Sequence, residues 1–255
     1  MKVHRGLERF INDELPAVTR SFAARDSGVI RYLVIGLQRS GTTLVGDLLD
    51  QHPDVEWLGE RFWAGVVFPY RFMVGLTSSG EYSCSGLKLF SYLLKARGPG
   101  AAARLLSKLR RDGWKFLAVE RSDRLAQAIS LARAVRNQRW TSKRGTADES
   151  FVGRPREVVV DLAELEKAFQ FLDMATAFQA SLLERVPAMR LVYERDLEAE
   201  AKHQKAASAM FSYLGLPDCA VKARLTKQAG GALAERVANW EEVQAIYARY
   251  GRGAR

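Results

Sequence analysis

The chain has 255 residues, of which 47% are hydrophobic and 27% are charged. This composition excludes a disordered, collagen-like or simple coiled-coil chain and predicts a single globular domain over residues 1–255. Two cysteines exclude a disulfide framework. No apolar run reaches the ~20 residues of a membrane span and the N-terminus has no signal-peptide pattern, so we expect a cytoplasmic protein.

The charge of the chain is strongly positive, with 39 Lys and Arg against 29 Asp and Glu and a net charge of +10. Such a balance fits three classes of partner: nucleic acid, an acidic membrane surface, or a polyanionic small molecule. The basic residues cluster at 104–111 and 133–144. Solvated helix faces would show the same clusters, so composition alone leaves the three classes open.

The first third of the chain alternates between polar and apolar segments. Residues 1–29 are expected to form a polar, partly helical lead-in. Residues 31–37 are a short run rich in Val and Ile and predict a buried strand. Leucines at helical spacing predict a helix over 44–51, which His52 and Pro53 end. Residues 61–85 are aromatic, show no period, and are expected to form a loop.

The remaining elements continue the alternation of strands and helices. In chain order they are a strand running into a helix at 86–94, a basic helix at 101–111, a strand at 115–119, a helix to about Trp140, a polar loop at 141–156, a helix from the capping box Asp161-x-x-Glu164 to about Leu183, a strand at 189–193, and a helical tail with a cap at Asn239. This order predicts a parallel sheet covered on both faces, a three-layer α/β/α domain.

The residues with the clearest chemical meaning are Gly36-Leu-Gln-Arg-Ser-Gly-Thr-Thr43, between the first strand and its helix. Glycines let the backbone turn so that successive N–H groups point into one concavity, and the helix behind presents its positive end. Arg39 adds a permanent charge, and Thr42 and Thr43 add hydroxyl donors. The segment therefore predicts a phosphate-binding loop.

The spacing matches the nucleotide P-loop G-x-x-x-x-G-K-[ST] except at Thr42, which stands at the lysine position. That lysine reaches the β- and γ-phosphates, so its replacement argues against an ATPase or GTPase. The loop is still suited to an anion shorter than a triphosphate, such as a single 5′-phosphate that carries another group.

The segment GLQRSGTTLVGDLLDQHP resembles the 5′-phosphosulfate loop of sulfotransferases that use 3′-phosphoadenosine 5′-phosphosulfate (PAPS). The block from Arg121 through Ser130 to Trp140 resembles their 3′-phosphate site. The sequence Gln-Ala-Ile-Ser at 127–130 is similar to that of the bacterial trehalose 2-sulfotransferase-like branch, which acts on carbohydrates and glycolipids. Three weaker similarities are the segments Gly86-Leu-Lys88, Tyr193-Glu-Arg-Asp-Leu197 and the closing VANWEEV.

The resemblance implies PAPS as the cofactor, 3′,5′-adenosine bisphosphate as its product, and no metal. The implied cofactor-binding residues are Gln38, Arg39, Ser40, Gly41, Thr42, Thr43, Arg121, Ser130 and Lys227. Two departures from the family pattern matter. Ser122 replaces a second basic residue, so Arg121, Ser122 and Ser130 are alternatives for holding the 3′-phosphate. Arg195 is inserted into a Y-E-D-L segment.

Sulfuryl transfer to a hydroxyl needs a base and stabilisation of the leaving phosphate. Glu60, in the segment WLGERFW, resembles the glutamate of the trehalose-type branch, and its aromatic neighbours are expected to exclude water from it. His52 is the alternative base. Arg39 is placed for the leaving side, and Lys88 is expected to neutralise the transferring group. The loops 61–85 and 141–156 are expected to lie near the acceptor.

Three other functions remain as alternatives. A P-loop-type small-molecule kinase would use the segment ending at Asp161 to hold Mg²⁺. A non-catalytic polyanion- or nucleic-acid-binding protein would explain the charge, although its basic residues should interleave with aromatics. A sulfotransferase fold without activity is the third. We expect a sulfotransferase with a small hydroxyl acceptor, no nucleic-acid partner and no membrane span. Peripheral membrane contact and oligomeric state stay open.

Overall fold

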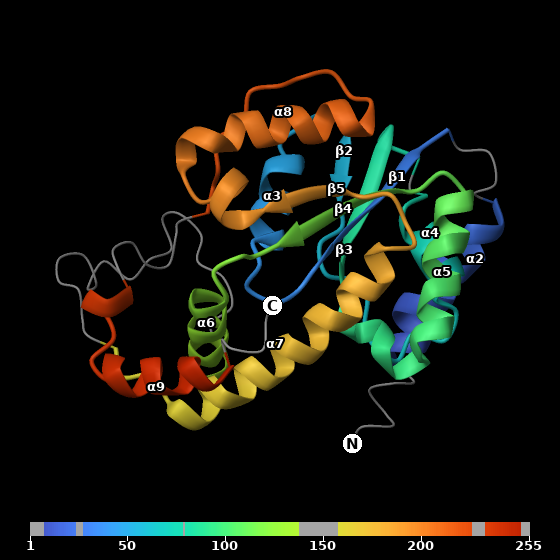
Figure 1. Ribbon diagram of the computed structural model, residues 1–255. Helices are drawn as coiled ribbons and strands as arrows, with labels where there is room; N and C mark the ends of the chain where they lie inside the picture. Colours follow the sequence, from blue (N-terminus) through green and yellow to red (C-terminus); the bar gives the residue numbers. More distant parts are fainter. Residues whose placement is uncertain (1–7, 24–27, 79, 138–157, 226–232, 251–255) are drawn as a thin grey trace.

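The fold of the computed structural model is organised around a five-stranded sheet in which all strands are parallel (Figure 1). The structure describes residues 8–23, 28–78, 80–137, 158–225 and 233–250. The strands are β1 (Ile30–Gly36), β2 (Val55–Trp57), β3 (Cys84–Phe90), β4 (Lys115–Glu120) and β5 (Met189–Val192). Their order in the sheet is β2-β3-β1-β4-β5, so β1 lies at the centre.

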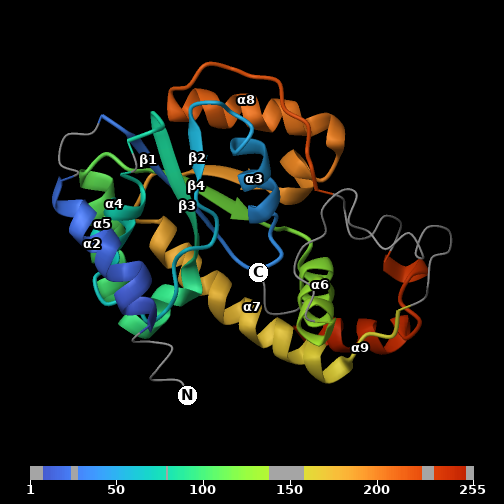
Figure 2. The same cartoon turned by 180° about the vertical axis from the view of Figure 1, so that it is seen from behind.

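Helices cover both faces of this sheet (Figures 1 and 2). One face is covered by α3 (Thr42–Leu49) and α8 (His203–Leu214). The other is covered by α4 (Pro69–Leu76), α5 (Pro99–Arg111) and the C-terminal end of α7 (Leu162–Leu183), with α2 (Leu15–Ala23) packed on α4. The predicted three-layer α/β/α fold is confirmed. No helix among the described residues is both long and apolar enough to cross a membrane.

Successive side chains of β1 enter opposite apolar layers. Tyr32 and Val34 pack with α3 and α8, whereas Leu33 and Ile35 pack with the helices of the other face. All four are at most 1% exposed. Because neighbouring side chains of a strand point to opposite faces, a strand that is apolar throughout is stable only when both faces are covered. The continuous apolar run at 31–37 therefore indicates a strand in a sheet that helices cover on both faces.

A third apolar cluster lies beyond the sheet, among α6 (Arg124–Asn137), α7 and α9 (Trp240–Tyr250). Figure 1 shows α7 running from the sheet out to α6 and α9. The predicted cap of α7 is confirmed, since the Asp161 carboxylate accepts a hydrogen bond from the Glu164 N–H at 3.1 Å. Asn239 directly precedes α9, and its carbonyl accepts a hydrogen bond from the Val243 N–H at 3.1 Å, as expected of a cap. Its side chain instead pairs with both the N–H and the C=O of Val160 and so attaches α9 to the start of α7.

Several short helical elements are π- or 3-10 helices, a type that the sequence analysis does not predict. They are the π-helices η1 (Phe10–Glu14) and η4 (Tyr193–Leu197), and the 3-10 helices η2 (Ser91–Arg97), η5 (Glu200–Lys202) and η6 (Leu233–Glu235). The edge strand β2 has three residues, too few for a visible period, and α4 begins at Pro69 inside the segment expected to be a loop. The N-terminal segment is not only a polar lead-in, because Glu14, Ala17 and Ser21 are buried.

The sheet topology brings the carboxyl ends of the central strands together at one edge. The strand β3 pairs with one side of β1, and the next strand in the chain, β4, pairs with the other side. The strand order therefore reverses at β1. In open α/β sheets, ligands bind beside the carboxyl ends of the strands where the order reverses in this way. The segments that follow β1, β3, β4 and β5 therefore define the candidate site.

Candidate active site at the carboxyl edge of the sheet

The predicted phosphate loop forms a tight turn between β1 and α3. Arg39 has a φ of 60° and Gly41 a φ of 99°, both in the left-handed region. The left-handed conformation is costly for a residue with a side chain, and such strain clusters at functional sites. The Ser40 hydroxyl donates to the Leu37 carbonyl at 2.8 Å, and Ser40 and Thr42 are buried. The Ser40 hydrogen bond closes the turn, whereas Thr43 is only partly buried.

Two glycines of the loop are required by close packing. A Cβ at Gly36 would lie 2.5 Å from the Thr42 methyl group and 3.1 Å from the Val119 carbonyl oxygen. A Cβ at Gly41 would lie 2.7 Å from the Tyr193 ring, in addition to the strain of its positive φ. A side chain at either position would push the loop away from its neighbours, so the glycines preserve a cradle that backbone groups line.

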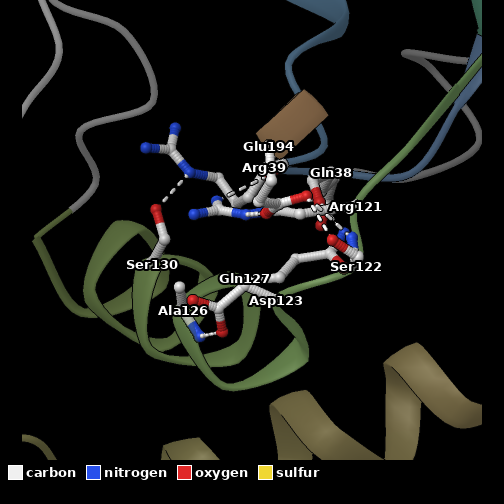
Figure 3. A network of polar contacts seen from close by, with 9 residues as sticks. All are labelled: Gln38, Arg39, Arg121, Ser122, Asp123, Ala126, Gln127, Ser130 and Glu194. Carbon is white, nitrogen blue, oxygen red and sulfur yellow. Dashed lines mark hydrogen bonds and ion pairs between the residues drawn. The ribbon is translucent and has the colours of Figure 1, made fainter. Parts of the chain in front are cut away.

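The loop and the second predicted motif meet directly (Figure 3). The Arg39 guanidinium donates through Nε to the Ser130 hydroxyl at 2.8 Å, and Arg121 donates to the Arg39 carbonyl at 3.1 Å. The Gln127 amide donates to the Gln38 carbonyl at 2.9 Å. Three contacts thus join segments about 90 residues apart in the chain. The predicted cofactor-binding residues Gln38, Arg39, Arg121 and Ser130 lie in one cluster.

Glu194 is not among the predicted site residues, yet it organises this cluster. Its carboxylate forms an ion pair with Arg121 at 3.1 Å and accepts hydrogen bonds from the Ser122 N–H and hydroxyl at 2.9 and 2.8 Å. Partial burial alone would raise the pKa of Glu194, but these hydrogen bonds hold the pKa below its ordinary value. Arg121 and Glu194 follow the adjacent strands β4 and β5, which is the signal that could have predicted their meeting.

The inserted Arg195 is accommodated by a π-helical turn over Tyr193–Leu197. A π-turn holds one residue more than an α-turn and often marks a functional site. Arg195 projects outward and pairs with Asp196, while Glu194 reaches Arg121 and Leu197 is fully buried. The insertion therefore leaves the contacts of the Tyr193–Leu197 segment with the loop in place.

The electrostatics of the cluster are those of an anion site. Burial lowers the pKa of the Arg39 guanidinium, and the nearby positive charges of Arg121 and Arg133 lower that pKa further. Arg133, one turn after Ser130 on α6, also has a pKa lowered by burial and by the charge of Arg236. Its Nε is buried without a hydrogen-bond partner in the described part of the chain. Bound phosphate would relieve this repulsion among like charges. Arg133 is not among the predicted site residues.

Glu60 and Lys88 meet on the other side of the loop, near the end of β3. Their carboxylate and ammonium groups form an ion pair at 3.1 Å, with side chains 49% and 10% exposed respectively. The Lys88 N–H also donates to the Gly59 carbonyl at 2.9 Å, which fixes the segment that carries Glu60 beside β3. Glu60 is thus half exposed and paired with a cation, rather than enclosed by its aromatic neighbours as the sequence predicts.

Tyr92 connects the Glu60 region with the phosphate loop. Its phenol oxygen accepts a hydrogen bond from the Gln38 amide at 2.9 Å. Burial, together with the negative charge of Glu60, raises the pKa of Tyr92 to about 12. Tyr92 therefore keeps its proton at neutral pH and can act as a hydrogen-bond donor but not as a base. The sequence carries no signal for this role, because Tyr92 lies in the short helix η2 after β3.

A cavity of about 790 Å³ adjoins Glu60. Its walls come from the aromatic segment, which the sequence predicts as the acceptor side, and from the N-terminal helices; they include Phe62, Trp63, Phe72, Asp13, Pro16 and Arg20. Trp63 packs edge-on against Phe72 with ring centres 5.0 Å apart. Aromatic faces beside scattered polar groups suit sugars and amphiphiles, so the cavity has the composition expected of an acceptor pocket.

The alternative base, His52, lies after the far end of α3 and is 2% exposed. Its Nδ1 accepts a hydrogen bond from the Asp54 N–H at 3.1 Å, so its Nε2 is the donor to the Pro217 carbonyl at 3.0 Å. The ring also packs on Phe211. Both ring nitrogens are thus engaged with backbone groups away from the loop, and the structure does not bring His52 to Glu60 and Arg39.

We expect His52→Gln to lower the free energy of unfolding by about 1–3 kcal/mol, because it disturbs two buried hydrogen bonds. Nucleotide affinity should stay at the wild-type value, since no loop contact changes. Chemical denaturation and calorimetric titration with 3′,5′-adenosine bisphosphate check both statements. A stable variant that has lost nucleotide binding would contradict this structural role.

Two predicted features lie outside the described residues: Lys227 and the loop 141–156. The kinase alternative depends on Asp161, whose carboxylate is engaged as the cap of α7, in the cluster with α6 and α9. This placement gives Asp161 a structural role and leaves the phosphate loop without a Walker-type aspartate from that segment.

Comparisons with known proteins add one result to this geometry. A family model described as "Sulfotransferase family" matches residues 32–73, which contain most of β1, the phosphate loop, α3 and Glu60. No curated protein is significantly similar to the chain. The matched segment is short, but it carries the loop around which the other site residues assemble. It supports a sulfotransferase family for this chain, and with it sulfuryl transfer as the general activity.

Proposed function

We propose that this protein transfers the sulfuryl group of PAPS to a hydroxyl group of a carbohydrate, glycolipid or similar small acceptor. The observation that carries the proposal is the contact between Arg39 of the phosphate loop and Ser130 of α6, at 2.8 Å. A nucleotide with phosphates at both its 5′ and 3′ positions needs two anion sites close together. The two motifs that resemble those sites meet at this contact, with Arg121 beside them.

The residues present fit such a donor. Backbone N–H groups of the loop and the N-terminus of α3 would hold the 5′ end, and glycines 36 and 41 keep that cradle free of side chains. Arg121, Ser130 and Arg133 would hold the 3′-phosphate, where burial, together with the positive charges of neighbouring arginines, lowers the pKa values of Arg39 and Arg133. Ser122 is a weaker candidate, because its hydroxyl is bound to Glu194.

When bound, the donor supplies a sulfuryl group whose bond to the 5′-phosphate breaks as the bond to the acceptor oxygen forms. Glu60 would accept the proton of the acceptor hydroxyl at its carboxylate. Lys88, paired with Glu60 at 3.1 Å, would place a positive charge beside the group in transfer. Arg39 and the loop N–H groups would stabilise the negative charge left on the phosphate oxygen. The cavity beside Glu60 would hold the acceptor.

Thermal unfolding with nucleotides tests the donor assignment. At about 100 times its dissociation constant, 3′,5′-adenosine bisphosphate should stabilise the protein by about 2.7 kcal/mol. For a chain of this size we expect a rise in melting temperature of about 5–10 °C. The same concentration of 5′-AMP should give a smaller rise, because it lacks the 3′-phosphate that Arg121 and Ser130 would bind. Stabilisation by Mg·ATP alone would overturn the proposal in favour of a kinase, and no response would favour a protein without nucleotide chemistry.

A further inference from the structure

The N-terminal helices η1 and α2 present three different faces. Glu14, Ala17 and Ser21 are buried against the rest of the protein. Asp13, Pro16 and Arg20, on a second face, line the cavity that contains Glu60. The third face carries Ile11, Leu15 and Phe22, which are 50%, 47% and 61% exposed. Packing within the protein accounts for the first two faces but not for the exposed apolar stripe, and such a stripe is typical of an interaction surface.

This stripe continues onto the start of α4. The Glu14 carboxylate accepts hydrogen bonds from the Val67 and Phe68 N–H groups, which places the two segments side by side. Val67 and Phe68 are 56% and 49% exposed. Five of the nine exposed large hydrophobic side chains in the described residues therefore lie together. We call these five residues, Ile11, Leu15, Phe22, Val67 and Phe68, the apolar patch.

A basic groove of about 970 Å³ lies along α5 and reaches Arg185, which follows α7. The helix α5 itself packs beside α4 (Figures 1 and 2). Its cationic walls are Arg104, Lys108, Arg110, Arg111 and Arg185, and none of the described residues that line it is a carboxylate. We call these five residues the basic groove. The single close acidic contact that the structure describes for them is Asp112, 3.5 Å from Lys108.

Cation–π contacts connect the apolar patch with the basic groove. The Arg71 guanidinium lies 4.3 Å from the centre of the Phe22 ring and 5.9 Å from that of Tyr70. The Lys108 ammonium lies 4.0 Å from the Tyr70 ring. The surface therefore passes from exposed apolar side chains through aromatic rings with cations above them to a groove of positive charge.

We propose that the apolar patch and the basic groove form a docking surface for an anionic phospholipid bilayer. Apolar side chains enter the boundary between headgroups and acyl chains, while Lys and Arg bind the anionic headgroups. Charge complementarity favours this occupant, because an uncharged apolar partner would leave the five cations of the groove without a counterpart. The net charge of +10 acts in the same direction.

The position of α2 links docking to the acceptor. The helix that carries the apolar patch also forms a wall of the cavity beside Glu60, so docking would hold that cavity at the membrane interface. The acceptor class that fits this arrangement is a hydroxyl on the headgroup of a membrane lipid. This last step rests on the proposed sulfotransferase function, whereas the docking surface does not.

Vesicle sedimentation tests the docking surface. The 255-residue chain should sediment with vesicles of phosphatidylcholine and phosphatidylglycerol and stay in solution with phosphatidylcholine alone, and high salt should release it. Arg110→Gln/Arg111→Gln should weaken binding by about twenty-five-fold, at about fivefold for each cation. Phe22→Ser/Phe68→Ser should weaken it by about tenfold or more. All four side chains are exposed, so both variants should fold, which circular dichroism checks.

Matched controls separate docking from unspecific attraction of a basic protein. Lys205→Gln/Lys222→Gln removes two exposed charges on the α8 side of the sheet, and Met174→Ser removes an exposed apolar side chain on α7. Both controls should bind vesicles within about twofold of the wild type. Equal losses in the docking and control variants would overturn the proposal.

Two further results would also overturn it. If Phe22→Ser/Phe68→Ser turns a dimer into a monomer in light scattering, a second copy of the chain covers the apolar patch. If vesicles leave every form of the protein in solution while the bisphosphate still raises the melting temperature, docking fails and the proposed function stands. If the protein binds vesicles but shows no response to nucleotides, the docking surface stands and the proposed sulfotransferase function fails.

Discussion

Replacing Glu60 by glutamine is expected to lower turnover by about 10²–10⁴ and to leave bisphosphate affinity unchanged. Glutamine keeps the size and the hydrogen-bonding capacity of the side chain but cannot accept the proton of an acceptor hydroxyl. Glu60 is half exposed and lines the cavity proposed for the acceptor, so its replacement should disturb neither folding nor the nucleotide cluster. Turnover is measured as release of 3′,5′-adenosine bisphosphate from PAPS in the presence of a disaccharide or glycolipid acceptor.

The matched control is Asp13→Asn, which removes another carboxylate from the wall of the same cavity. It should keep turnover within a fewfold of the wild type, because Asp13 lies on the N-terminal helices and not beside Lys88. Lys88→Met provides a second comparison: it removes the cation of the pair and should also lower turnover. Full activity of Glu60→Gln would eliminate Glu60 as the base.

Arg121→Ala should weaken binding of 3′,5′-adenosine bisphosphate by about a hundredfold. The substitution removes a cation from the proposed 3′-phosphate site, leaves the Glu194 carboxylate without its ion pair, and takes a hydrogen bond from the Arg39 carbonyl. Because Arg121 is assigned to the 3′-phosphate, the loss should be larger for the bisphosphate than for 5′-AMP. Calorimetric titration with both nucleotides measures this difference, and equal losses would contradict the assignment.

Glu194→Gln tests whether Glu194 positions Arg121 and Ser122. It should weaken bisphosphate binding less than Arg121→Ala, since glutamine still accepts a hydrogen bond. The pKa of Glu194 is lowered in the folded protein. The ionised carboxylate therefore makes its full contribution to the free energy of unfolding at pH values above its ordinary pKa of 4.5. That contribution is lost as pH falls through the lowered folded value. The variant should therefore lose less stability than the wild type when the solution is acidified, and an unchanged pH dependence would remove this role.

Features decided by neighbouring residues can be predicted from the sequence. The run at 31–37, the glycine loop and the helix after it appear in the structure within two residues of their expected positions. The Asp161 cap is equally local, because donor and acceptor are three residues apart. The parallel order of strands also predicts that Arg39 and Arg121 follow strands that end at the same edge.

Features decided by contacts between distant segments are not visible in the sequence. Tyr92 and Arg133 have ordinary local contexts, and only the folded chain places them beside Gln38 and Arg39. The order of the strands places Glu194 near Arg121, but only the structure shows their ion pair. Burial of a side chain is likewise a tertiary property. Glu60 is paired and half exposed where aromatic neighbours predict enclosure, and β2, at three residues, forms only because β3 provides a partner.

By itself, the sequence determined the sheet with its phosphate loop and the residues able to bind an anion, because turns, caps and periodicity act over a few residues. Only the tertiary structure decided which charges converge on the loop, that His52 is engaged elsewhere, and that one N-terminal helix borders both a cavity and an exposed apolar patch. The physical reason is that electrostatic interaction and burial depend on distance in space, which the spacing of residues along the chain does not determine.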